Sequence, residues 1–350
     1  MAREPLNNSD QMLLVANPTS RSGKAAERVE RVRALLDLYG LPYRLEPTLP
    51  NGKTMNRVRY AIEIEGFRTV VYLGGDGTFN EVAKGICLSG KAREVRLGML
   101  PSGTANDQGK SFGISSTTRA LKKNLRIIEA GYTTQLDVGE VTAYSDDGTV
   151  LTRDLFFDSV GWGLSAAILA FRNQELEIVK KVPVMRDMYR DHMVYIRAAV
   201  RELALSWLTR DRFTAEVTVD GASHVLSHLS DLVVNNTTVY AGDWIIDPES
   251  RHDDGKFEVT PFSGVRDWTS KIILHHKKIP LNEEMVNRIG VSHAPTFKGS
   301  DIQLQFFRPN KDKRLLAQLD GDEFPPADRF SIRVHPRLIN LIVPENFHWI

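Results

Sequence analysis

A short apolar segment that runs directly into a glycine-rich turn places the strongest constraint on the fold of this chain. Residues 69–73 are continuously apolar and rich in β-branched side chains, which is typical of a strand buried on both faces. The turn that follows is Gly74-Gly75-Asp76-Gly77-Thr78, and residues 79–88 then have the spacing of a helix. This unit predicts a parallel sheet covered by helices.

The same order of signals recurs on both sides of this unit. Residues 12–16, 42–45 and 95–100 are predicted strands, and residues 25–38 and 55–64 are predicted helices. We therefore expect an α/β domain with a parallel sheet over residues 1–132. Ligands of such sheets bind at the carboxyl ends of the strands.

The pattern changes at about residue 133. Alternating segments separated by turn pairs such as Asp220-Gly221 predict an antiparallel β-sandwich over residues 133–335. One predicted helix, residues 184–208, interrupts it, and residues 336–350 form a C-terminal segment that we expect to return to the first domain. The predicted strands are residues 137–144, 151–157, 214–219, 229–234, 256–261, 302–307, 315–319 and 330–335.

Composition narrows the classes of protein to consider. The formal net charge is +1, so no global excess of positive charge indicates a nucleic-acid partner. A single cysteine, Cys87, excludes an internal disulfide framework. The first residues lack the apolar core of a signal peptide, and no run approaches the ~20 apolar residues of a membrane-spanning helix. We therefore expect a cytoplasmic protein that would reach a lipid partner from the membrane surface.

Three loops after predicted strands have a composition suited to phosphate. Asn17-Pro18-Thr19-Ser20-Arg21-Ser22-Gly23-Lys24 places hydroxyls and a cation ahead of a helix N-terminus. In the glycine turn the backbone can approach phosphate, while the carboxylate of Asp76 suggests Mg²⁺. Pro101-Ser102-Gly103-Thr104-Ala105-Asn106-Asp107 is a third such loop. Each alone is compatible with an ordinary turn, but three at successive strand ends predict a nucleotide site.

In these motifs the chain resembles the catalytic domain shared by diacylglycerol kinases, sphingosine kinases and bacterial lipid kinases. The Gly-Gly-Asp-Gly stretch also occurs in NAD kinases and phosphofructokinases, whereas the Gly-Thr-Ala-Asn-Asp stretch separates the lipid kinases from both. The resemblance continues in order through Asn17-Pro18-Thr19-Ser20, Asp137-Val138-Gly139, Asp253-Asp254-Gly255-Lys256-Phe257 and Leu319-Asp320-Gly321-Asp322. It implies an NAD kinase-like α/β domain, a β-sandwich, an active site between them, and the cofactors ATP and Mg²⁺.

The resemblance also implies roles for individual residues. Asp322 would be the catalytic base, and Asp76 and Asp320 would order metal and water, since phosphoryl transfer depends on positioning and charge neutralisation. Asp254 resembles the metal-linked aspartate of the family, with Asp76 as a second metal candidate. Without this context, Asp320-Gly321-Asp322 would be interpreted as a hairpin turn. The predicted nucleotide site comprises Asn17, Thr19, Ser20, Gly74, Gly75, Gly77, Thr78, Glu81, Gly103, Thr104 and Asn106.

The sequence departs from the family pattern at four positions. Arg21 stands where glycine is frequent, Gln108 where a bulky apolar residue is common, and Asp158 where we expect asparagine. Asp322 replaces the usual glutamate and is one methylene shorter. A displacement of ~1 Å can cost ~10²-fold in rate, so this change bears directly on activity.

The identity of the acceptor is left open between two lipid classes. Ser159-Val160-Gly161-Trp162-Gly163 is similar to a stretch in sphingosine kinases, which place an acidic residue shortly after it to hold the substrate amine. Here that position corresponds to Ala167. Because a desolvated ammonium needs a partner, a pocket without a carboxylate favours a diacylglycerol-like acceptor over a sphingoid base.

Two further hypotheses belong to other functional classes. One is an NAD kinase-type metabolite kinase, against which the Gly-Thr-Ala-Asn-Asp stretch argues. The other is a nucleotide-binding regulator weakened in catalysis, which is motivated by the shorter Asp322. Contact with a membrane surface is expected if the acceptor is a lipid, and a homodimer remains an open alternative.

Overall fold

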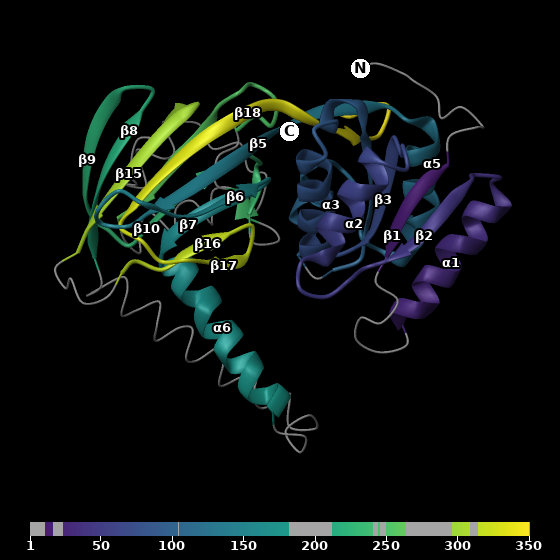
Figure 1. Cartoon of the computed structure of the whole chain (residues 1–350), viewed down its shortest axis with the longest axis horizontal. Coiled ribbons are helices and arrows are strands. Elements are labelled where there is room, and N and C mark those ends of the chain that lie inside the picture. Colours follow the sequence, from purple (N-terminus) through teal and green to yellow (C-terminus); the bar gives the residue numbers. More distant parts are fainter. Residues whose placement is uncertain are drawn as a thin grey trace, which may run out of the picture.

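The computed structural model describes two halves that are joined by long strands (Figure 1). One half is a parallel sheet with helices against it, and the other is a pair of antiparallel sheets. The residues that the structure describes are 11–16, 24–103, 105–181, 212–240, 244–245, 250–263, 296–308 and 314–349.

The α/β half is built on four parallel strands in the order β2-β1-β3-β4. Every residue of β1 and β3 is buried, which explains why their sequences are continuously apolar. The strands are β1 (Met12–Ala16), β2 (Tyr43–Pro47), β3 (Thr69–Gly74) and β4 (Arg96–Pro101). The helices are α1 (Lys24–Leu38), α2 (Lys53–Glu63), α3 (Asp76–Leu88), α4 (Asp107–Ser111) and α5 (Leu121–Ala130).

The second half is an antiparallel sandwich whose core comes from both of its sheets. One sheet contains β5 (Thr133–Tyr144), β6 (Val150–Phe156), β8 (Phe213–Val219), β9 (Ala222–Leu229), β15 (Asp301–Phe307) and β18 (Arg329–Ile342). The other contains β7 (Ser159–Gly163), β10 (Asp231–Asn235), β13 (Phe257–Phe262), β14 (Phe297–Gly299), β16 (Ala317–Leu319) and β17 (Asp322–Phe324). A short pair, β11 (Val239–Tyr240) and β12 (Trp244–Ile245), lies apart from both sheets. The predicted fold class is confirmed.

Strand β18 belongs to both halves. Its first part pairs with β15 and β5 in the sandwich, and its last residues pair with β5 and, in parallel, with β4. The register shifts between His335 and Ile339, where the carboxylate of Asp137 accepts the backbone N–H of Arg337 at 2.6 Å. The residues after 336 therefore lie on the parallel sheet, while the exact domain boundaries remain predictions.

Two helices differ from the sequence-based prediction. Helix α3 begins at Asp76, three residues before the predicted start, because the glycines of the turn already take part in its first turn. Helix α6 (Leu164–Lys181) was not predicted, and it follows β7 directly. The helix predicted for residues 184–208 lies outside the described residues. Within the part of the chain that the structure describes, no helix is long and apolar enough to cross a membrane.

Candidate functional site

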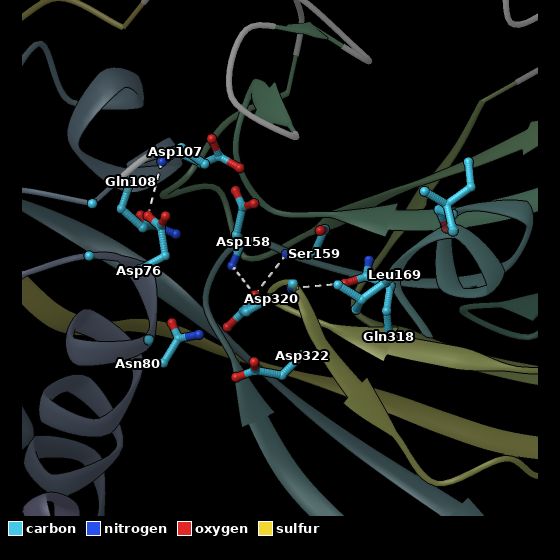
Figure 2. Close-up of a pocket in the computed structure, with 17 residues that line it drawn as sticks. Asp76, Asn80, Asp107, Gln108, Asp158, Ser159, Leu169, Gln318, Asp320 and Asp322 are labelled. Carbon is cyan, nitrogen blue, oxygen red and sulfur yellow. Dashed lines mark hydrogen bonds between the residues drawn. The ribbon is translucent and has the colours of Figure 1, made fainter. Parts of the chain in front are cut away.

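A cavity of about 430 Å³ lies between the two halves, and we call it the central cavity (Figure 2). Its α/β wall consists of loops at the carboxyl ends of β3 and β4, where ligands of parallel sheets bind. Its sandwich wall consists of the β6–β7 loop, the start of α6 and the β16–β17 turn. The lining residues are Gly75, Asp76, Gly77, Asn80, Gly103, Ala105, Asp107 and Gln108 on the first wall, and Asp158, Ser159, Ser165, Ile168, Leu169, Gln318, Asp320, Gly321 and Asp322 on the second.

The α/β wall requires glycine where its two loops meet. A Cβ atom on Gly103 would lie 2.6 Å from the Cα atom of Gly75, closer than real Cβ contacts allow. The backbone N–H of Ser102 donates to the carbonyl of Gly74 at 2.6 Å and holds the loops together. Each loop therefore needs its glycine because the other loop packs against it. The same lack of side chains lets the backbone approach a phosphate closely.

Asp76 holds the second loop in place. Its Oδ2 accepts the backbone N–H of Asn106 at 2.8 Å and its Oδ1 that of Asp107 at 3.0 Å. The Asn106 side chain in turn bonds the backbone N–H and carbonyl of Gly103 at 2.8 and 2.7 Å. Asp76, which the sequence suggested as a metal ligand, therefore also fixes the shape of the loop around Gly103.

Asp320 has the corresponding position on the sandwich wall. Its carboxylate accepts three backbone N–H groups of the β6–β7 loop, those of Phe157, Asp158 and Ser159, at 2.8–3.0 Å. Burial raises the pKa of Asp320 to about 6, and the three donors act in the opposite direction. Asp320 ties the hairpin turn to the loop, and Asp322 of the same hairpin also lines the cavity.

Asp322 lies where the central cavity meets a second one. This side cavity has a volume of about 700 Å³ and shares Gly77, Asn80 and Asp322 with the central cavity. Figure 2 shows the side chains of Asn80 and Asp322 pointing toward each other from opposite walls. The other residues of the side cavity are Thr48, Leu49, Pro50, Asn51, Thr78, Glu81 and Lys84.

The pKa of Asp322 is raised above its ordinary value. Although the residue as a whole is exposed, partial desolvation of the carboxyl is the main cause, the charges of Asp154 and Glu81 add to it, and the ammonium of Lys84 opposes it. The Nζ atom of Lys84 donates to Oδ2 of Asp154 at 2.7 Å, an ion pair that links α3 to β6. A carboxylate with a raised pKa beside a cation suits proton removal from a hydroxyl.

Sequence reasoning missed Asn80 and Lys84, although a signal was present. Gly77, Asn80, Glu81 and Lys84 recur at three- and four-residue steps and line the same cavity from one face of α3. Glu81 and Thr78, predicted for the nucleotide, lie on or beside this face. Polar side chains at helical spacing directly after the glycine turn could have identified the whole set.

Asp158 and Gln108, two of the departures from the family pattern, line the central cavity together. Burial raises the pKa of Asp158 well above its ordinary value, and the neighbouring charges of Asp107, Asp320 and Asp76 add to the effect. Its Oδ1 accepts the hydroxyl of Thr237. Gln108 is only 2% exposed, and within the described part of the chain neither amide atom has a hydrogen-bond partner.

Other predicted site residues lie elsewhere. Asp254 lines a separate cavity with Arg93 and Arg337, and its Oδ2 is paired with Nζ of Lys298 at 2.7 Å, so the structure does not bring it to Asp76. Ala167 is packed in the sandwich core and does not line the central cavity, which removes the basis for choosing a lipid from that position. Asn17, Thr19, Ser20, Arg21 and Thr104 lie outside the described residues.

The donor set of the central cavity fits Mg²⁺ only together with a ligand. Among the described residues no group of three or more acidic, histidine or cysteine side chains could hold a metal ion by itself. Mg²⁺ is commonly bound by one or two carboxylates plus phosphate oxygens and water. The carboxylates that line the cavity meet that pattern, whereas Asp254 with its lysine partner does not. The metal roles of Asp76 and Asp254 remain predictions.

Comparison with known proteins gives one family match. Residues 11–141 match the diacylglycerol kinase catalytic domain, a range that contains both glycine loops.

Three similar proteins agree with that match. The probable lipid kinase YegS of Salmonella newport is 34% identical over 136 residues, which cover 38% of this chain and 42% of that protein, so the match spans less than half of either. A diacylglycerol kinase of Mycobacterium tuberculosis is 24% identical over 70% of this chain and 71% of its own length. A crystal structure of a diacylglycerol kinase from Bacillus anthracis has a TM-score of 0.65 at 15% identity, covering 97% of this chain and 98% of that one. At that identity the likeness shows the fold.

Proposed function

Because residues 11–141 match the diacylglycerol kinase catalytic domain, we propose that this chain transfers the γ-phosphoryl group of ATP to a hydroxyl of a lipid, in the cavities between its two halves. The acceptor is a diacylglycerol-like lipid reached at a membrane surface. A sphingoid base is the alternative acceptor.

One observation carries this proposal. Asp322 lies at the junction of two cavities, one with apolar side chains from Ile168 and Leu169, the other beside the helix that starts in the glycine turn. A bisubstrate reaction needs two binding sites that meet at the reacting atoms. The carboxylate at the junction can therefore contact both substrates.

The side cavity is the proposed nucleotide site. The N-terminus of α3 carries a partial positive charge and lies at the junction, where the terminal phosphates would bind. Lys84 provides a full positive charge on the same face. The β2–α2 loop, including Thr48, then contacts the rest of the nucleotide. Glycines 75 and 77 let the backbone approach the phosphates.

Asp322 is the proposed general base. It takes the proton of the lipid hydroxyl as the hydroxyl oxygen bonds to the γ-phosphorus and the bond to the β-phosphate oxygen breaks, releasing ADP. Mg²⁺, when bound, neutralises charge on the phosphates, and the carboxylates of the central cavity are its candidate ligands. Asp320 and Asp76 hold the loops that set the distance between the two substrates.

The test is transfer of labelled γ-phosphate from ATP with Mg²⁺ to diacylglycerol and to sphingosine in mixed micelles, with NAD as a third acceptor. Wild type should label a lipid, and Asp322→Asn should lower kcat by ~10²–10⁴-fold while ATP binding is retained. Glu323→Gln, an exposed neighbour on the same strand, is the matched control and should keep wild-type activity. Labelling of NAD alone, or of no acceptor, would contradict the proposal.

A further inference from the structure

The apolar end of the central cavity contains two polar side chains that the reaction described above does not use. Ser165 on α6 and Gln318 on β16 line the same wall as Ile168 and Leu169. They are brought together because β16 and β7 are paired, with Gln318 opposite Gly161. This end lies on the acceptor side of Asp322, away from the side cavity.

The orientation of the Gln318 amide is fixed by a hydrogen bond. Its Oε1 accepts the backbone N–H of Gly321 at 2.9 Å, as the dashed line in Figure 2 shows. The amide cannot be flipped without losing this bond, so the Nε2 group is the one left over. Gln318 is 3% exposed, and its Nε2 has no hydrogen-bond partner in the described part of the chain. A buried N–H donor without a partner is costly, and a ligand oxygen would satisfy it.

The Ser165 hydroxyl is held by a buried carboxylate behind the wall. Its Oγ donates to Oδ1 of Asp231 at 3.1 Å, and its backbone N–H donates to Oδ2 at 3.3 Å. Asp231 is fully buried at the start of β10, and burial raises its pKa well above the ordinary value. These two bonds fix the position of Ser165 beside Gln318.

Gly161 keeps the two polar atoms together. A Cβ atom at that position would lie 2.9 Å from Oγ of Ser165 and 3.0 Å from Nε2 of Gln318, so any side chain there would displace both. The two atoms therefore face the same side of one backbone position. A single polar group of a ligand can reach both of them.

We propose that Gln318, with Ser165 beside it, forms a subsite that recognises an oxygen on the carbon next to the phosphorylated hydroxyl, and so selects glycerolipids over sphingoid bases. The proposal rests on the lipid-kinase function above and names its acceptor class. An amide N–H donates to an ester or hydroxyl oxygen. Gln318 is the discriminating group, because the Ser165 hydroxyl already donates its proton to Asp231 and its Oγ can only accept. A sphingoid ammonium has only donors, so it would leave the Gln318 N–H without a partner.

This inference is tested by exchanging the amide donor of Gln318 for an acceptor of the same shape. Gln318→Glu keeps an oxygen for the backbone N–H of Gly321 but replaces Nε2 with a carboxylate oxygen, which accepts from an ammonium. Initial rates are measured with diacylglycerol and with sphingosine in mixed micelles. We expect Gln318→Glu to lower kcat/KM for diacylglycerol by ~10-fold and to raise the sphingosine-to-diacylglycerol ratio by at least that factor.

Two further variants separate recognition from folding. Gln303→Glu makes the same charge change on an exposed face of β15 and should leave the ratio unchanged. Gln318→Ala removes the donor without adding a charge and should raise KM for diacylglycerol with ATP binding intact. An equal loss on both lipids in Gln318→Glu, or a wild type that prefers sphingosine, would overturn this inference. A wild type that phosphorylates no lipid would instead refute the proposed function.

Discussion

The two walls of the central cavity are built in different ways. On the α/β wall the shape comes from the backbone, since two glycine loops touch and the Asp76 carboxylate accepts two main-chain N–H groups. On the sandwich wall the side chains contribute more, since Asp158 and Asp322 have carboxyls with raised pKa values. Among the described residues, an amide nitrogen without a hydrogen-bond partner occurs on both walls, at Gln318 on the sandwich wall and at Gln108 on the α/β wall. From this difference we infer that the α/β wall binds the phosphates, which are the same for every acceptor, and that the sandwich wall binds the acceptor.

The largest expected effect on phosphate transfer comes from disturbing the backbone wall. Gly103→Ala places a Cβ 2.6 Å from the Cα of Gly75, a clash that no side-chain rotation relieves. We expect phosphate transfer to fall by ~10²-fold and the free energy of unfolding to fall by about 1–3 kcal/mol. Gly77→Ala, where nothing lies within 4 Å of the new Cβ, should keep wild-type stability in the same denaturation assay. Equal stability of both variants would show that the loops do not need to touch.

The anchoring aspartates of the two walls can be compared directly. Asp320→Ala leaves three buried N–H groups without an acceptor and places alanine at a φ of 48°, whereas Asp76→Ala leaves two. We expect Asp320→Ala to lower the free energy of unfolding by about 3–5 kcal/mol and Asp76→Ala by roughly 1 kcal/mol less. Urea denaturation measures both. A greater loss in Asp76→Ala would reverse the comparison.

A third change should stabilise the sandwich wall. Asp158→Asn keeps an acceptor for Thr237 and removes a charge close to Asp107, Asp320 and Asp76. Because the folded pKa of Asp158 is raised, wild-type stability is complete at acidic pH and declines as pH rises through that pKa. The variant should therefore gain about 1 kcal/mol over wild type at pH 8 and little at pH 4. Thermal melting in EDTA at both pH values measures this, and a gain confined to pH 4 would contradict the assignment.

The smallest expected effect comes from Lys84, whose ammonium on α3 is paired with Asp154 on β6. The Lys84 ammonium lowers the pKa of Asp322, so Lys84→Met should move the acidic limb of the kcat–pH profile to higher pH. With ATP at saturation we expect a loss of kcat that is a few-fold larger at pH 6 than at pH 8, and a higher KM for ATP at both pH values because Lys84 also lines the proposed nucleotide site. Lys84→Arg retains the charge and should leave the limb in place. An acidic limb that does not move would mean that Asp322 is not the group that titrates.

Sequence motifs located the lining of the central cavity where its residues are close together in the chain. The glycine turn that contains Asp76, the loop at Gly103 and the hairpin at Asp320 are each continuous motifs, and the structure brings all three to one cavity. Ser165 and Gln318 are more than 150 residues apart and meet only because β7 and β16 pair, which no local pattern encodes. Asp254 shows the limit of motif order. Its motif occurs at the expected place in the sequence, but the structure places Asp254 in another cavity, away from the carboxylates of the central cavity.

Strand β18 has a consequence for how this chain can be divided. Its final residues, including Asn340 and Leu341, complete the parallel sheet next to β4, although they are encoded more than 200 residues after it. A gene fragment ending near residue 132 would leave that side of β4 without its neighbour and expose unpaired backbone groups to aggregation. The N-terminal unit is therefore not separable by truncation, and an engineered version would need the C-terminal strand supplied by a linker or a circular permutation.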